Sequence, residues 1–247
     1  MIASLPMYDL PPQQGANDRF WQAIRAHLGE GPAALTRQGD LWDHWLSPDL
    51  VLSQTCGYPY RARLHGKVTL VGTPDYDLPG CPPGYYNSVF VARADDARSD
   101  LRDYAKARFA YNEPMSQSGW AAPLTHVQAL GFAFKDLLQT GGHRASALAV
   151  AEGRADLAAL DALTWRLLQR HDGFTTGLTE LARTTPTPVL PYITALHRDG
   201  APIFTAIKAA IDDLSDEDRE TLSLKGILHI PAKEYLAVAS PPGPEEG

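Results

Sequence analysis

Two serines and a glycine, Ser116, Ser118 and Gly119, follow a short apolar run and precede a helical pattern. This order predicts a strand that delivers the serine hydroxyls to a helix N-terminus, where the first backbone N–H groups lack intrahelical partners and the helix dipole is positive. Such a turn suits an anion or a strongly polar ligand, and the glycine would let it approach the backbone. Serine before a helix is also a common N-cap, so a plain capped helix is the alternative interpretation.

Other polar and aromatic residues also follow apolar segments. In α/β proteins, ligands bind outside the carboxyl ends of the strands, so these residues are candidates for the wall of a binding site. The alternatives are a helix N-cap for Asp161, capping or packing for His143, and surface positions for the tyrosines. The candidates are Tyr8, Gln54, Thr55, Tyr58, His143 and Asp161.

The sequence contains none of the common catalytic motifs. It has no Gly-x-Ser-x-Gly elbow, no P-loop, no His-Glu-x-x-His and no dinucleotide-binding glycine pattern. A triad of His143, one of the two serines and Asp161 can be drawn, but nothing in the spacing requires them to touch. We therefore expect no catalytic residues, no cofactor and no metal site.

The only two cysteines, Cys56 and Cys81, lie in glycine- and proline-rich turns. A disulfide between them would contribute roughly 3 to 4 kcal/mol in an oxidising compartment. Two separate thiols in a reducing compartment are the equal alternative. Their spacing fits no zinc motif.

Strands and helices alternate along the chain. This order predicts an α/β fold with parallel strand pairing. Two further extended stretches, residues 88–92 and 186–196, are interpreted as crossings between two lobes. The strands are expected at residues 2–7, 33–35, 50–52, 68–72, 109–111 and 155–161, and the main helices at 17–28, 119–130, 145–153 and 201–211.

Composition restricts the class of protein. The chain has 247 residues, of which 44% are hydrophobic and 21% charged, as in ordinary globular domains. Its net charge of -7 argues against a nucleic-acid partner, and no apolar run approaches the roughly 20 residues that span a bilayer. The first residues have no secretory-signal pattern, so we expect either no export or a signal already removed.

Several phrases together resemble the phosphate- and phosphonate-binding branch of the type II periplasmic binding proteins, the solute receptors of ABC importers. The sharpest is the Ser-x-Ser-Gly turn, followed in the same order by a Gly-His and an Ala-Asp phrase. The resemblance spans nearly the whole chain. The phrases are residues 3–8, 52–58, 71–76, 112–119, 142–146 and 153–161.

The resemblance implies two α/β lobes, two hinge strands and a ligand cleft between the lobes. Lobe 1 would comprise residues 1–88 and 194–247, and lobe 2 residues 89–193. Residues 240–247 are expected to form a disordered tail because they are poor in apolar side chains. The implied function is capture of phosphate, phosphite or a phosphonate for uptake. The implied partner is an ABC permease, the implied location is the periplasm, and a monomer is expected.

The family pattern also implies roles for individual residues. Ser116, Gln117 and Ser118 would hold the phosphoryl oxygens, with His143 and Asp161 nearby. Tyr8 and Tyr58 would form the aromatic wall, and Tyr86 aligns with it only loosely. Gln117 departs from the family, in which phosphonate binders often have threonine. A cytosolic sensor or an enzyme on the same fold is the alternative function.

Overall fold

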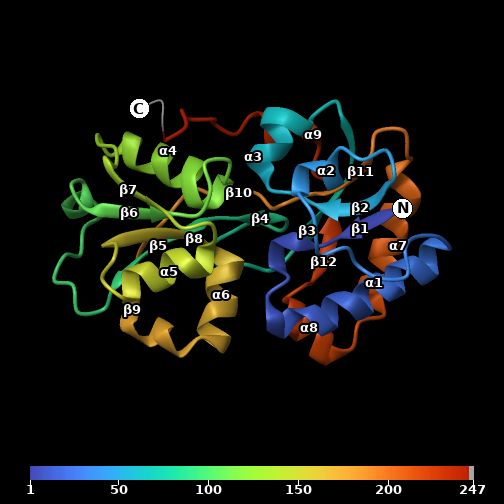
Figure 1. Ribbon diagram of the computed structural model, residues 1–247, viewed down its shortest axis with the longest axis horizontal. Coiled ribbons are helices and arrows are strands. Elements are labelled where there is room, and N and C mark those ends of the chain that lie inside the picture. The colour runs from blue at the N-terminus through green and yellow to red at the C-terminus, as the bar shows by residue number, and fades with distance from the viewer. Residues whose placement is uncertain (245–247) are drawn as a thin grey trace. The chain divides into compact units, whose positions relative to one another are not determined.

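The computed structural model describes residues 1–244. The chain forms two compact units, each built from separate stretches of sequence (Figure 1). Unit 1 comprises Met1–Tyr85 and Pro188–Ala237, and unit 2 comprises Tyr86–Thr187 and the chain from Val238 onward. The chain passes between them at β4 (Tyr85–Tyr86) and β10 (Thr187–Pro188), which pair as a two-stranded sheet.

Unit 1 has a five-stranded sheet in the order β1-β2-β11-β3-β12. Strands β1 and β2 are parallel, whereas β11 runs antiparallel to both β2 and β3. The strands are β1 (Ile2–Ser4), β2 (Leu50–Gln54), β3 (Val68–Asp75), β11 (Tyr192–Ala195) and β12 (Gly226–Leu228). The helices are α1 (Gln14–Leu28), α2 (Leu41–Trp45), α3 (Gly57–Pro59), α7 (Gly200–Asp212), α8 (Asp216–Leu222) and α9 (Ala232–Leu236), with short 3-10 or π turns at Pro6–Tyr8, Pro11–Gln13 and Tyr60–Leu64.

Burial of apolar side chains on both faces holds the unit 1 sheet. Helix α7 packs on β3 and β12, and α1 packs on α7 and α8. Another cluster joins α2, α9 and the strands through Trp45, Leu50, Tyr60, Ile193 and Tyr235, all buried. Strand β2 has no exposed residue, and its first three residues, 50–52, are consecutive apolar residues rather than an alternating pattern.

Unit 2 has a five-stranded sheet in the order β7-β6-β8-β5-β9. Strands β6, β7 and β8 are parallel, and β5 runs antiparallel to β8 and β9. Figure 1 shows α4 on one face and α5 and α6 on the other. The strands are β5 (Ser88–Arg93), β6 (Arg108–Tyr111), β7 (Asp136–Gln139), β8 (Leu157–Asp161) and β9 (Leu178–Arg183). The helices are α4 (Ala122–Ala129), preceded by a π turn at Gln117–Ala121, α5 (His143–Ala151) and α6 (Ala162–His171), with 3-10 turns at Leu101–Tyr104 and Gly173–Gly177.

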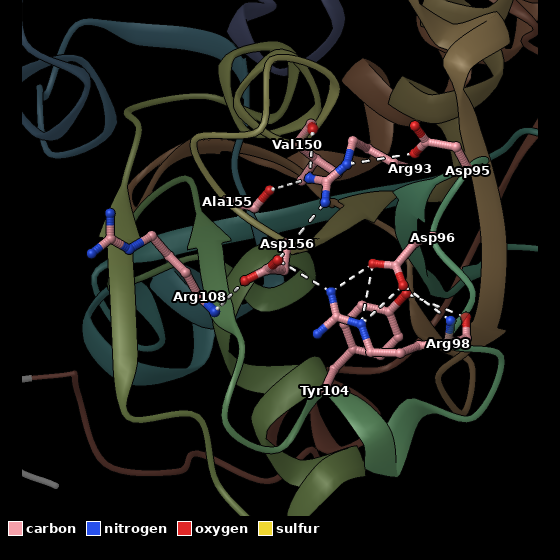
Figure 2. A network of polar contacts seen from close by, with 9 residues as sticks. All are labelled: Arg93, Asp95, Asp96, Arg98, Tyr104, Arg108, Val150, Ala155 and Asp156. Atoms are coloured by element: carbon pink, nitrogen blue, oxygen red, sulfur yellow. Dashed lines mark hydrogen bonds and ion pairs between the residues drawn. The ribbon is translucent and has the colours of Figure 1, made fainter.

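A polar network fastens the amino ends of β6 and β8 (Figure 2). The Arg98 guanidinium bridges Asp96 at 2.6 Å and Asp156 at 3.1 Å, and it lies 4.1 Å over the Tyr104 ring. The other Asp156 oxygen accepts the Arg108 N–H at 3.0 Å. Hydrogen bonds from Arg98 hold the pKa of Asp96 well below its usual range. The network lies at the opposite end of these strands from their carboxyl ends, so we assign it a structural role rather than a ligand-binding one.

The structure differs from the sequence expectations in several elements. Residues 88–92 do not cross between units: they form β5, inside the unit 2 sheet. Residues 33–35 form no strand, and the expected first strand ends at Ser4, two residues before Pro6 begins a 3-10 turn. Both sheets are mixed rather than purely parallel, because β11 and β5 run against their neighbours.

The C-terminal tail packs as far as it is described. Pro241 is buried, and the Pro242 carbonyl accepts the Trp120 indole N–H at 3.0 Å. This contact groups the tail with unit 2, although the sequence assigned it to the first lobe. Disorder therefore does not describe residues 240–244, and residues 245–247 lie outside the described part.

Candidate ligand-binding site

The carboxyl ends of β6, β7 and β8 gather the candidate residues of unit 2. The Ser116–Ser118 turn follows β6, His143 follows β7 after two glycines, and Asp161 is the last residue of β8. Strand β5 runs the other way and begins with Ser88 opposite Asp161. Topology therefore brings residues from four separate sequence segments to one edge of the sheet.

Ser116 is the N-cap of the helical segment that begins at Gln117. Its backbone is extended, and its Oγ accepts the Gly119 N–H at 2.9 Å. The cap interpretation is therefore correct for Ser116, whose hydroxyl hydrogen can still be donated.

Gly119 has a different role from the one expected. A Cβ at this position would lie 1.8 Å from the Asn112 Oδ1 atom, so the missing side chain makes room for Asn112 rather than for a ligand. This Asn112 oxygen is buried and has no hydrogen-bond partner within residues 1–244.

Ser118 and His143 are joined directly. The Ser118 Oγ atom lies 3.0 Å from Nε2 of His143, and the serine is buried. Burial lowers the pKa of His143 to about 4, against the opposing effect of a backbone hydrogen bond to Ala159. The imidazole is therefore neutral at pH 7. When the ring proton is on Nδ1, Nε2 accepts the Ser118 hydroxyl hydrogen, and when the proton is on Nε2, the ring donates to Ser118 and leaves the serine hydrogen for a ligand oxygen.

Asp161 caps helix α6. One carboxylate oxygen accepts the N–H groups of Leu163 at 2.8 Å and Thr164 at 3.0 Å. The sequence left open whether Asp161 caps the helix or contacts a ligand, and the structure shows the helix cap. These two bonds occupy one oxygen, Oδ1, and the side chain is buried at the same sheet edge as Ser118.

In unit 1, Tyr8 and Gln54 meet at a small pocket. The Gln54 Nε2 group donates to the Tyr76 hydroxyl at 3.2 Å and to the Leu190 carbonyl at 3.0 Å. The ring of Tyr8 lies edge-on to that of Tyr76, with centroids 5.2 Å apart. The pocket is lined by Leu5, Tyr8, Asn17, Phe20, Gln54, Tyr76, Tyr192, Leu222 and Leu224.

Two other unit 1 candidates do not line this pocket. Thr55 is fully buried beside Gln54, and its hydroxyl has no hydrogen-bond partner within residues 1–244. Tyr58 is half-buried, with the Arg61 guanidinium 4.4 Å over its ring. Tyr86, whose alignment was loose, is buried at the chain crossing.

Sequence reasoning missed Tyr76, Tyr192 and Asn17 in the pocket lining. Tyr76 directly follows β3, and the rule that marked Tyr8 would have marked it too. Tyr192 begins β11 opposite Gln54, a pairing across 138 residues that local sequence does not reveal.

The two cysteines do not form the disulfide that the sequence left open. Cys56 and Cys81 are half-buried and are not joined by a disulfide.

The basic residue beside His143 is already paired. Arg144, which follows His143 in the sequence, forms an ion pair with Asp172. Ser116, Ser118 and His143 therefore offer hydrogen bonds without a formal positive charge.

Comparison with known proteins places these features in a family. The family model "ABC transporter, phosphonate, periplasmic substrate-binding protein" matches residues 49–232. No curated protein matches the chain significantly. None of the helices within residues 1–244 is long and apolar enough to cross a membrane.

Solved structures show the same fold at low sequence identity. PhnD1 from Prochlorococcus marinus, in complex with methylphosphonate, has a TM-score of 0.72 and 17% identity, with 95% of this chain and 94% of that chain covered. A binding protein component of an ABC phosphonate transporter from Pseudomonas aeruginosa has a TM-score of 0.66 and 17% identity, with 92% and 80% covered. A histidine kinase sensor domain with similarity to periplasmic binding proteins has a TM-score of 0.60 and 16% identity, with 93% and 98% covered.

The fold is thus the α/β type II periplasmic-binding-protein fold, as expected from the sequence. Because the family model covers most of the chain and agrees with this fold, the chain belongs to the family of periplasmic substrate-binding proteins of phosphonate ABC transporters.

Proposed function

We propose that the protein captures a small phosphorus oxyanion, namely phosphate, phosphite or a phosphonate, and delivers it to an ABC permease. The observation that carries this proposal is the buried Ser118 hydroxyl, bonded to a neutral His143 and held at the start of a helical segment capped by Ser116. Hydroxyls and amides fixed in this way suit the oxygens of a tetrahedral anion.

The chemistry of binding follows from the charges. The chain carries a net charge of -7, so its overall field repels anions and local donors must hold the ligand. Hydrogen bonds to an ionised oxygen are roughly twice as strong as those between neutral groups. Ser116, Gln117 and Ser118 supply the phosphoryl contacts in this proposal, with His143 as the support of Ser118.

This proposal assigns ligand contacts to residues of each unit. Two buried hydroxyls, those of Ser88 in unit 2 and Thr55 in unit 1, have no partner within residues 1–244. Buried polar groups are nearly always hydrogen-bonded, so a ligand or water is the expected partner of each. Tyr8, Gln54 and Tyr58 complete the proposed contacts from unit 1. Asp161 would accept a hydrogen bond from a protonated ligand oxygen and would repel fully ionised competitors.

Titration calorimetry with phosphate, phosphite, methylphosphonate and 2-aminoethylphosphonate tests the proposal, with sulfate as the control anion. We expect saturable binding of at least one phosphorus oxyanion with one site per chain, and weaker binding of sulfate. Absence of binding to all four phosphorus compounds would overturn the ligand assignment.

A sensor built on the same fold is the second candidate function. Its support is the similarity to the histidine kinase sensor domain, which concerns the fold alone. The proposed location is the periplasm, as for the family, and a monomer is the proposed state. Cell fractionation and blotting of the native host distinguish the two functions. We expect a receptor in the periplasmic fraction, whereas a cytosolic sensor would be found in the cytosolic fraction.

A further inference from the structure

Residues 238–244, here called the strap, form a proline-rich segment that packs on unit 2. The chain returns to this unit at Val238, and the strap reaches the side of α4 (Figure 1). Residues 241–244 are Pro-Pro-Gly-Pro, and Pro241 is buried, whereas Ala239 and Ser240 are exposed. Proline-rich segments favour a preformed extended helix, so little conformational entropy is lost when they dock. A buried proline therefore anchors a segment whose composition alone predicts disorder.

The strap docks on an aromatic pair. The indole N–H of Trp120 donates to the Pro242 carbonyl at 3.0 Å, and Trp120 is 3% exposed. The Trp120 ring lies beside that of Tyr111, the last residue of β6, with centroids 5.1 Å apart. Aromatic-lined grooves are the usual receptors of proline-rich segments. Trp120 and Tyr111 therefore give the strap a defined docking site within unit 2.

Trp120 belongs to the same helical turn as Ser118. This turn, Gln117–Ala121, begins after the Ser116 cap, and the Trp120 backbone N–H donates to the Ser116 carbonyl at 3.3 Å. The preceding N–H, that of Gly119, donates to the Ser116 hydroxyl oxygen. A displacement of the Trp120 ring would therefore be transmitted to both serine hydroxyls through a single turn of backbone.

We propose that the docked strap holds this helical turn in its ligand-binding conformation, so that oxyanion affinity depends on the contact between Pro242 and Trp120. This inference rests on the proposed function, because it takes the Ser116–Ser118 turn as the ligand-binding element. Donors that are fixed before the ligand arrives lose less entropy on binding, which raises affinity. By thermodynamic linkage, the ligand in turn stabilises the docked strap by the same factor.

Shortened chains test the role of the strap, with calorimetry of phosphate, phosphite, methylphosphonate and 2-aminoethylphosphonate. A chain that ends at Ala237 should bind the tightest of these ligands at least fivefold more weakly than the full chain. A chain that ends at Pro244 keeps the strap and loses two negative charges, Glu245 and Glu246, so it is the matched control and should retain the affinity.

The outcomes separate this inference from the proposed function. Equal affinity of the full chain and the folded chain that ends at Ala237 would overturn the inference and leave the proposed function intact. Binding of none of the four compounds by the full chain would overturn both.

A single substitution tests the hydrogen bond itself. Trp120→Phe keeps an aromatic ring but removes the indole N–H, so affinity should fall at least threefold. Trp21 of unit 1 is fully buried and also donates its indole N–H to a proline carbonyl, that of Pro32, at 3.0 Å. Trp21→Phe therefore loses an equivalent bond away from the strap and should keep the affinity. Equal losses of affinity in the two variants would contradict the inference.

The full chain provides a readout that needs no variant. Each of the five tryptophans gives one indole resonance in a proton–nitrogen-15 NMR spectrum, and sequential assignment identifies that of Trp120. Saturation with the tightest-binding of the four compounds should shift this resonance and slow the hydrogen exchange of its N–H at least threefold. An unchanged Trp120 resonance and exchange rate at saturation would overturn the inference, even if the shortened chain and Trp120→Phe do not fold.

Discussion

Ser118 is the residue on which ligand binding most depends in this account. Replacing it with alanine removes a buried hydroxyl that would donate to charge, so Ser118→Ala should weaken oxyanion affinity by about 1 to 3 kcal/mol. Calorimetry measures the loss. Ser99→Ala, an exposed serine of the same unit, should bind as the wild type does. Unchanged affinity in Ser118→Ala would leave Ser118 with only a structural role.

His143 should affect the pH dependence of stability in a defined window. Its pKa is about 4 in the folded protein, because burial disfavours the imidazolium, and about 6.5 in an unfolded chain. Between these pH values the unfolded state binds more protons than the folded state, so the free energy of unfolding falls as the pH drops from 6.5 toward 4. The contribution of His143 to this free energy is fully present above pH 6.5. The slope for this one group is at most about 1.4 kcal/mol per pH unit.

Urea unfolding at several pH values between 4.5 and 7.5 tests this for the wild type and His143→Gln. The difference between their stabilities should change over this window, because glutamine does not titrate and all other groups are shared. Parallel curves would contradict a buried neutral histidine.

At the scale of elements, Asp161 links a helix cap to ligand selection. Asparagine also caps helices well, so Asp161→Asn should keep the stability, whereas Asp161→Ala should lose about 0.5 to 2 kcal/mol. If the carboxylate repels fully ionised ligands, Asp161→Asn should also bind phosphate relatively better at pH 8 than at pH 6, compared with the wild type.

Chemical denaturation and calorimetry at the two pH values separate these effects. Asp199, which caps α7 in unit 1, provides the control, because Asp199→Ala should lower the stability, Asp199→Asn should keep it, and neither should change phosphate binding. If the wild type and Asp161→Asn have the same stability and the same phosphate binding at both pH values, Asp161 acts only as a helix cap and has no part in ligand selection.

Sequence patterns predicted some elements well and others not at all. Strand β6 and the capped helix after it were predictable because an apolar run, a serine and a helical pattern follow one another locally. Strands β7 and β9 lie at the two edges of their sheet, and exposed residues such as Asp136 and Glu180 obscure the apolar pattern. Edge strands are commonly polar, so this loss of signal is physical.

The site was predictable only in part for the same reason. Ser118 and His143 could be named individually, but the hydrogen bond between them depends on the order of β6 and β7 in the sheet. The sequence predicted that Gly119 lets a ligand approach the backbone, but the side chain that lies close to this glycine is Asn112. Contacts between distant segments decide these roles.

At the scale of the whole molecule, the family and the fold agree with the sequence expectations. Phosphorus-31 NMR of the protein mixed in turn with phosphate, phosphite, methylphosphonate and 2-aminoethylphosphonate is the measurement that tests the central claim most directly. We expect a separate or broadened bound resonance that saturates at one ligand per chain for at least one of the four, and recovery of that ligand unchanged after the protein is removed. Four spectra identical to those of the ligands alone, or conversion of the bound ligand to another phosphorus compound, would contradict the claim.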